Sequence, residues 1–203
     1  MLPMRFSVSW LPKPKRRLGD SVIYGFAVLL GVLIGYLLGG RISRLSSLRF
    51  RALYLVPIAL LIQLLIFPLF TSEPLLPVGT VPLHILSYAL VFLFLALNLR
   101  VRPLAVLGAG AVANLAAILA NGGRMPASAT ALERAGLIQT AERLTTSGEH
   151  GNVLLMSEST TLNVLGDWLY LPSWFPGATA FSLGDLLIMI GLAYLIVKGM
   201  RSP

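Results

Sequence analysis

The sequence predicts an all-α membrane protein: a bundle of about five transmembrane helices with a partly helical segment outside the membrane. Of the 203 residues, 56% are hydrophobic and only 12% are charged, whereas ordinary soluble domains carry roughly 25% charged residues. The apolar residues gather in runs that approach the ~20 residues a helix needs to cross a bilayer. The basic residues gather in short segments between these runs. We therefore expect one polytopic membrane domain, 20–203, after a basic tail, 1–19.

Five apolar runs account for the predicted spans. The basic tail and the first run together resemble a secretory signal, but no clear small-residue cleavage site follows, so we interpret the run as a retained span. The predicted spans cover residues 21–40, 52–70, 82–98, 104–120 and 182–197, and residues 121–181 form the outer segment.

The charges predict the orientation of these spans. The segments 41–51 and 99–103 and the C-terminal end contain Lys or Arg and no acid, and all three fall on one side of a five-span arrangement. Short loops rich in Lys and Arg stay in the cytoplasm, so we expect the C-terminus inside, the N-terminus outside and every acid on the outer side. The basic tail opposes this orientation, and a re-entrant hairpin in place of the first span is the alternative. The formal charge of +8 then reflects contact with anionic lipid rather than with nucleic acid.

Glycines in two spans are candidates for close helix packing. Gly31, Gly35 and Gly39 form two overlapping GxxxG units, through which a second copy or another membrane protein could approach, although glycine is also common in membrane helices. The run around Gly108 and Gly110 imitates a dinucleotide-binding fingerprint. That fingerprint requires a strand, a turn and a helix, so we interpret these glycines as a packing face and expect no cofactor.

The outer segment is expected to contain a short helix that lies on the bundle. Thr130 and Glu133 have the spacing of a capping box, which would open a helix that continues to about Leu144. Further along the segment, aromatic residues mark the level of the lipid headgroups. They are Trp168, Tyr170, Trp174 and Phe175.

The two histidines, His84 and His150, are both predicted near the outer face, and His150 follows Glu149. Two histidines and a carboxylate can hold a metal ion. Without a motif such as H-E-x-x-H, two unrelated surface histidines are the simpler interpretation, and we expect no metal site.

A polar group of side chains is predicted at the outer membrane edge. Asn114 and Asn121 are seven residues apart and share a helix face. Asn121 begins the sequence N-G-G-R-M-P, in which two glycines and a proline end the helix. A helix C-cap with an interhelical hydrogen bond explains both asparagines. The functional alternative is a pocket, because irregular backbone at membrane depth usually faces protein or a cavity, and Arg124 and His84 would then join the candidate binding residues.

Asp167 and Asp185 flank an aromatic, proline-broken turn before the last span. A carboxylate at the membrane edge is costly unless it has partners, which makes it a candidate functional group. Two neighbouring carboxylates could divide acid and base roles on a water molecule. The alternative is that Asp167 caps a turn and Asp185 caps the last helix.

These residues carry two resemblances. The spans, together with N-G-G-R-M-P, L-G-D-W and F-S-L-G-D, resemble a family of bacterial integral membrane proteins of unknown function over nearly the whole chain after the tail. More locally, L-G-D-W and F-S-L-G-D-L-L-I-M-I-G are similar to the aspartate blocks of lipoprotein signal peptidase. That likeness implies catalytic roles for Asp167 and Asp185 and a matching asparagine at Asn121. The sequence departs from that family at two positions: Ser182 stands where the family has asparagine, and Gly184 stands where the family has alanine.

The expected function follows from these alternatives. A protein of a bacterial cytoplasmic membrane that binds lipid or assembles with membrane partners, with no enzymatic activity, is the first hypothesis. An aspartyl hydrolase acting on membrane-anchored substrates is the second. A transporter is the third, with little support because no repeat symmetry or further buried charges are evident.

Overall fold

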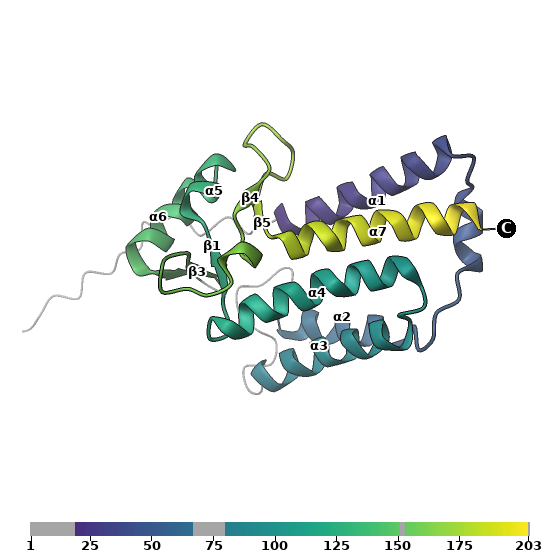
Figure 1. The fold of residues 1–203 in the computed structure, drawn as a ribbon, viewed down its shortest axis with the longest axis horizontal. Coiled ribbons are helices and arrows are strands. Elements are labelled where there is room, and N and C mark those ends of the chain that lie inside the picture. Colours follow the sequence, from purple (N-terminus) through teal and green to yellow (C-terminus); the bar gives the residue numbers. More distant parts are fainter. Residues whose placement is uncertain (1–18, 67–79, 151–152, 203) are drawn as a thin grey trace, which may run out of the picture.

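The structure, a computed structural model, describes residues 19–66, 80–150 and 153–202. It has two parts, a bundle of five long helices and a smaller lobe of short helices and strands at one end of the bundle (Figure 1). The predicted basic tail lies outside the described residues, except for Gly19, which begins the first helix.

The five long helices correspond to the five predicted spans. They are α1 (Gly19–Leu37), α2 (Leu55–Ile66), α3 (Thr80–Leu97), α4 (Arg102–Ala120) and α7 (Leu183–Arg201). Within the described residues, α4 and α7 are long and apolar enough to cross a membrane, judged by length and composition. The apolar parts of α1, α2 and α3 are shorter, at Val22–Leu37, Leu55–Leu65 and Ile85–Leu97. The described part of α2 ends at Ile66, inside the predicted span 52–70.

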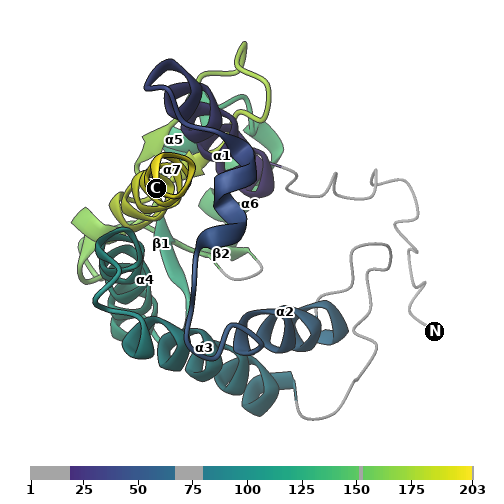
Figure 2. The ribbon, with the colours of Figure 1, turned by 90° about the vertical axis from the view of Figure 1, so that its right-hand side faces the viewer.

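The helices form an open arc in the order α1, α7, α4, α3, α2 (Figure 2). Helix α7 packs extensively against α1 on one side and α4 on the other, and α2 packs against α3. The contact between α3 and α4 is much smaller. Helix α7, the last in the sequence, is therefore the centre of the packing.

Glycines let the helices approach α7 closely. A methyl group on Gly31 would lie 2.9 Å from the carbonyl oxygen of Ala193, and one on Gly110 would collide with the carbonyl oxygen of Gly184. A methyl group on Gly35 would lie 2.5 Å from the side-chain sulfur of Met200. Gly31 and Gly35 thus face α7 of the same chain, whereas Gly39 lies in the turn after α1 with a φ of +76°. Association with another subunit through these glycines stays a prediction.

The lobe contains strands as well as helices, so the all-α expectation for the outer segment was incomplete. Strand β1 (Met125–Ala127) pairs in parallel with β3 (Val153–Leu155), which pairs antiparallel with β2 (Glu149–His150). A second pair is formed by β4 (Leu169–Tyr170) and β5 (Ala180–Phe181). Between the strands lie α5 (Ala129–Arg134), α6 (Ile138–Ser147) and the 3-10 turn η2 (Asn163–Leu165). The lobe has an apolar core that includes Leu132, Leu144 and Val153 and extends to Ala117 of α4.

The capping box expected at Thr130 and Glu133 was wrong. The residue that caps α5 is Ser128, whose side chain accepts a hydrogen bond from the backbone N–H of Ala131. Ser128 directly follows β1 and is itself a strong N-cap residue, so Thr130 falls inside the first turn. The expected helix is also divided, because Gly136, with a φ of +77°, separates α5 from α6.

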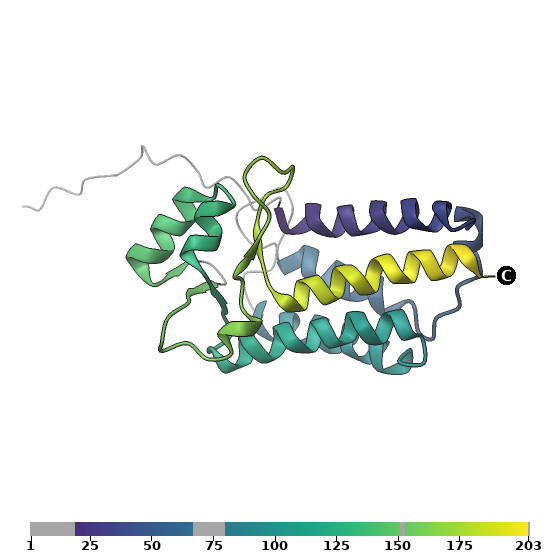
Figure 3. The same cartoon turned by 45° about the horizontal axis from the view of Figure 1, so that its top comes forward.

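The basic segments meet at the end of the bundle opposite the lobe (Figure 3). The 3-10 helix η1 (Ile42–Ser47) packs against the end of α7, and the backbone N–H of Arg41 donates to the carbonyl of Met200 at 2.9 Å. The buried side chain of Asn98 binds both the N–H and the carbonyl of Arg51, each at 2.9 Å. These bonds join the three carboxylate-free segments into one surface, which we call the basic end. Its cations are Arg41, Arg44, Arg49, Arg51, Arg100, Arg102, Lys198 and Arg201.

Candidate functional site

Asp185 is held by a capping box at the start of α7. The Ser182 hydroxyl accepts a hydrogen bond from the Asp185 backbone N–H at 2.9 Å, and the Asp185 carboxylate accepts one from the Ser182 backbone N–H, also at 2.9 Å. These bonds satisfy N–H groups that have no partner within the helix. The negative charge also lies at the positive end of the helix dipole, which stabilises it.

Two other helices donate to the same carboxylate. The Tyr24 hydroxyl of α1 and the Asn114 side-chain amide of α4 donate to one Asp185 oxygen at 2.9 and 2.8 Å. The Ser182 hydroxyl lies 2.8 Å from both the Asn114 carbonyl oxygen and the second Asp185 oxygen, and its proton can serve one of them at a time. We call Tyr24, Asn114, Ser182 and Asp185 the Asp185 cluster. It joins α1, α4 and α7 where they meet the lobe.

The absence of a side chain at Gly184 of α7 makes room for the cluster. Gly184 is buried, and a methyl group there would overlap the Asn114 side chain. A larger residue at this position would push α4 away from the cluster.

Asp167 belongs to the lobe and its side chain is buried. Its backbone extends the edge of β1: its N–H donates to the Pro126 carbonyl at 2.8 Å, and its carbonyl accepts from the Ser128 N–H at 3.0 Å. The Asp185 carboxylate accepts hydrogen bonds from Tyr24, Asn114 and Ser182. A catalytic pair of Asp167 and Asp185 stays a prediction. The observed bonds at Asp185 are a helix cap with Ser182 and two bonds from neighbouring helices.

Asn121 fastens the lobe to the end of α4. It is the C-cap residue of α4, and its side-chain amide donates to the carbonyls of Ala117 and Thr161, both at 2.8 Å. Its side-chain oxygen accepts from the Thr161 N–H at 2.9 Å. Both amide protons and the oxygen are thus used within the chain. This is the cap expected from the sequence, with a loop of the lobe in place of a neighbouring helix.

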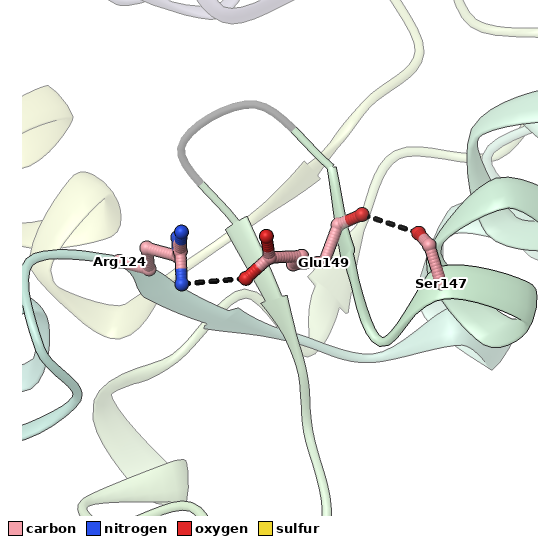
Figure 4. A network of polar contacts seen from close by, with 3 residues as sticks. All are labelled: Arg124, Ser147 and Glu149. Atoms are coloured by element: carbon pink, nitrogen blue, oxygen red, sulfur yellow. Dashed lines mark hydrogen bonds and ion pairs between the residues drawn. The ribbon is translucent and has the colours of Figure 1, made fainter.

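The remaining predicted residues lie apart from the Asp185 cluster. Arg124 forms an ion pair with Glu149 at 2.5 Å, at the surface of the lobe (Figure 4). His150 follows Glu149 in β2. His84 lies in α3, and its side chain is outside the described part of the structure. No group of three or more His, Cys, Asp or Glu side chains that could hold a metal ion occurs among the described residues.

Sequence reasoning missed two members of the cluster. Ser182 could have been found, because S-L-G-D at 182–185 has the spacing of a capping box directly before an apolar run. Tyr24 gives no local signal, since it is 161 residues away from Asp185 in the sequence.

Comparison with known proteins gives a family and no activity. Neither a curated protein nor a solved structure matches the chain. Residues 47–197 match DUF5317, a family of unknown function. The match covers α2 to the greater part of α7, including the lobe and three of the four cluster residues, and leaves out α1 with Tyr24. The chain therefore belongs to the DUF5317 family of unknown function.

Proposed function

We propose that the protein crosses a bacterial cytoplasmic membrane five times, displays the lobe on the outer side, and acts by binding lipid or a membrane partner rather than by catalysis. In this arrangement the basic end is cytoplasmic and the Asp185 cluster lies at the outer membrane edge. The cluster then holds α1, α4 and α7 in the positions that support the lobe.

The poor burial of the apolar helices α4 and α7 is the observation that carries the membrane assignment. Within an 18-residue apolar stretch of each helix, only 28% is buried inside the protein in α4 and 22% in α7. This is so although α7 is the most extensively packed helix. The core helix of a soluble protein is instead mostly buried. Large exposed apolar surfaces mark contact with a membrane or with another protein.

The shorter helices have the same property. Leucine side chains are exposed along α1 and α2. Among them are Leu29, Leu33, Leu37, Leu60 and Leu61, each more than half exposed. In water this surface would favour aggregation, whereas in lipid it needs no further cover. The exposed leucines therefore support membrane positions for α1 and α2 as well. Where the apolar part of a helix is short, the bilayer can become locally thinner.

The charge distribution supports the orientation. The eight cations of the basic end have no acidic partner among the described residues, and the ion pair of Arg124 with Glu149 is in the lobe. A carboxylate-free basic surface is typical of the cytoplasmic side. Anionic lipid headgroups would supply the missing counter-charge.

The bonds on Asp185 favour a supporting role over catalysis. Both carboxylate oxygens accept hydrogen bonds from within the chain, and the capping box fixes the side chain at the helix start. A general acid or base needs an oxygen within reach of substrate or of a water molecule. The hydrolase alternative drawn from signal peptidase requires Asp167 to share a water molecule with Asp185.

Fractionation and two substitutions test the proposal. We expect the protein to stay in the membrane pellet after alkaline carbonate extraction. We expect Asp185→Asn to lower accumulation, and both Asp185→Asn and Asp167→Asn to leave lipoprotein processing intact. Release by carbonate would contradict the membrane assignment. Loss of processing in a variant that accumulates normally would contradict the non-catalytic role and support the hydrolase.

A further inference from the structure

An apolar groove runs between α3 and α4 and ends at the basic end. Its volume is about 290 Å³, near the lower end of the range for small-molecule sites. Phe92 and Leu95 line it from α3, and Leu99 lines it from the turn that follows this helix. Gly108 and Val112 line it from α4. Polar atoms contribute little to its surface, so it suits a hydrocarbon segment better than a polar ligand.

Small residues create the groove. On α4 its floor is made by Ala105, Gly108 and Ala109. A methyl group on Gly108 would lie 3.7 Å from the nearest atom of Leu95, an ordinary contact distance. By contrast, a methyl group on Gly110, two residues later, would collide with the backbone of α7. Helix α4 therefore packs closely against α7 and makes a much smaller contact with α3.

The length and direction of the groove fit an acyl chain. From Ala105 to Val112 it follows seven residues of α4, which is about 10 Å at 1.5 Å per residue. The hydrocarbon core of a bilayer is about 30 Å thick, so each leaflet contributes about 15 Å. The groove thus extends from the basic end into a single leaflet, in the direction that lipid chains follow.

Two cations are close in sequence to the end of the groove. Arg100 is adjacent in sequence to the groove residue Leu99, and Arg102 is three residues before Ala105. Both arginines are exposed, and neither has an acidic partner within the described residues. Guanidinium groups bind phosphate through two parallel hydrogen bonds, which makes arginine well suited to a lipid headgroup.

We propose that this groove holds one acyl chain of an anionic phospholipid of the adjacent leaflet, with Arg100 and Arg102 bound to its phosphate. The inference rests on the membrane position proposed above and assigns lipid binding to the basic end, far from the Asp185 cluster. A second membrane helix could also use small residues to approach, but it would leave the two arginines without counter-charge.

Lipid retention by the full-length protein tests the headgroup contact. The purified protein is equilibrated in detergent with equal amounts of phosphatidylglycerol and phosphatidylcholine, and bound lipid is counted by native mass spectrometry. We expect preferential retention of one phosphatidylglycerol. The pair Arg100→Gln and Arg102→Gln should lower this preference about tenfold or more, since each arginine near an anionic surface contributes roughly fivefold. The matched pair Arg49→Gln and Arg201→Gln removes the same charge from the basic end and should change it less than about twofold.

Filling the groove tests the acyl chain. Ala109→Phe places a ring in the groove and should abolish retention, whereas Ala120→Phe, on the same helix at the lobe end, should not. The headgroup contact would be overturned by equal losses in the two arginine pairs or by no preference for phosphatidylglycerol. The acyl-chain site would be overturned by equal effects of the two phenylalanines or by a protein subunit found in place of lipid. A failure of the membrane assignment would be recognised separately, because carbonate would then release the protein.

Discussion

The two sides of the arc are built from different residues. Helices α1, α4 and α7 carry glycines at their contacts, and their backbones meet closely around the Asp185 cluster. Helices α2 and α3 contain no glycine and consist largely of leucine and other large apolar residues. They pack on each other but only slightly on α4. The comparison teaches that hydrophobicity predicts where helices are, whereas small residues predict which helices pack against each other at close range.

The largest effect is expected from an alanine at the α4–α7 contact. Gly110→Ala should destabilise the protein by about 3 kcal/mol, because its methyl group meets backbone atoms that cannot move aside. In a chain of this size that corresponds to a fall in Tm of about 6–12 °C, measured by thermal unfolding in detergent.

The matched control is Gly108→Ala, two residues away on the face toward α3. Its methyl group has ordinary space, and alanine favours helix over glycine by up to about 1 kcal/mol. We expect an unchanged or slightly higher Tm. Equal losses at Gly108 and Gly110 would show that the two sides of α4 do not differ in packing.

The next effect is expected at the cluster that fixes the glycine-rich side. Asp185→Asn should cost about 2 kcal/mol, because an amide replaces one acceptor oxygen with a donor that faces the donors of Ser182, Asn114 or Tyr24. Glu142→Gln makes the same chemical change at an exposed position of α6 and should leave Tm unchanged. A stable Asp185→Asn protein would mean that the cluster does not hold the three helices together.

A smaller and local effect is expected in α2 and α3. Asn98→Ala removes the bonds to both backbone groups of Arg51, just before α2. We expect the local free energy of opening to fall by about 1 kcal/mol, so hydrogen exchange should become roughly fivefold faster in α2 and α3 and stay unchanged in α4 and α7. Uniform acceleration across all five helices would argue that the arc opens as one cooperative unit.

The smallest effect is expected at the surface of the lobe. The ion pair of Arg124 and Glu149 is half-exposed on both sides, and such pairs contribute about 0–1 kcal/mol. A double-mutant cycle with Arg124→Gln and Glu149→Gln should give a coupling below about 0.5 kcal/mol that disappears at high salt. A larger coupling that resists salt would indicate a structural role for the lobe surface that its exposure does not suggest.

Much of the bundle could be predicted from the sequence. Each of the five apolar runs contains a helix in the described residues, because the run itself carries the signal. The short strands of the lobe could not be predicted in this way. Strands β1 and β3 have three residues each and pair across 28 positions of sequence, so neither contains an alternating pattern long enough to recognise.

The site was predicted in part for a similar reason. Asp185 as a helix cap and Asn121 as a C-cap are local features, and both were among the alternatives drawn from the sequence. Asn114 was placed at the outer edge by its helix position, and the structure brings it to Asp185. The capping box was assigned to Thr130 and Glu133 although the same spacing at Ser182 and Asp185 is the one that forms. At α5 the N-cap position is taken by Ser128, two residues before Thr130, so the pattern at Thr130 and Glu133 is not used.

Labelling from outside the cell tests the central claim, that the lobe and the basic end lie on opposite sides of a membrane. The chain has no cysteine, so single cysteines can be introduced without background at Gln139 in α6 and at Ser46 in η1, both exposed. In intact cells, a membrane-impermeant maleimide should label Gln139→Cys and should label Ser46→Cys only after the cells are permeabilised. Labelling of Ser46→Cys in intact cells, or of neither position until permeabilisation, would contradict the arrangement.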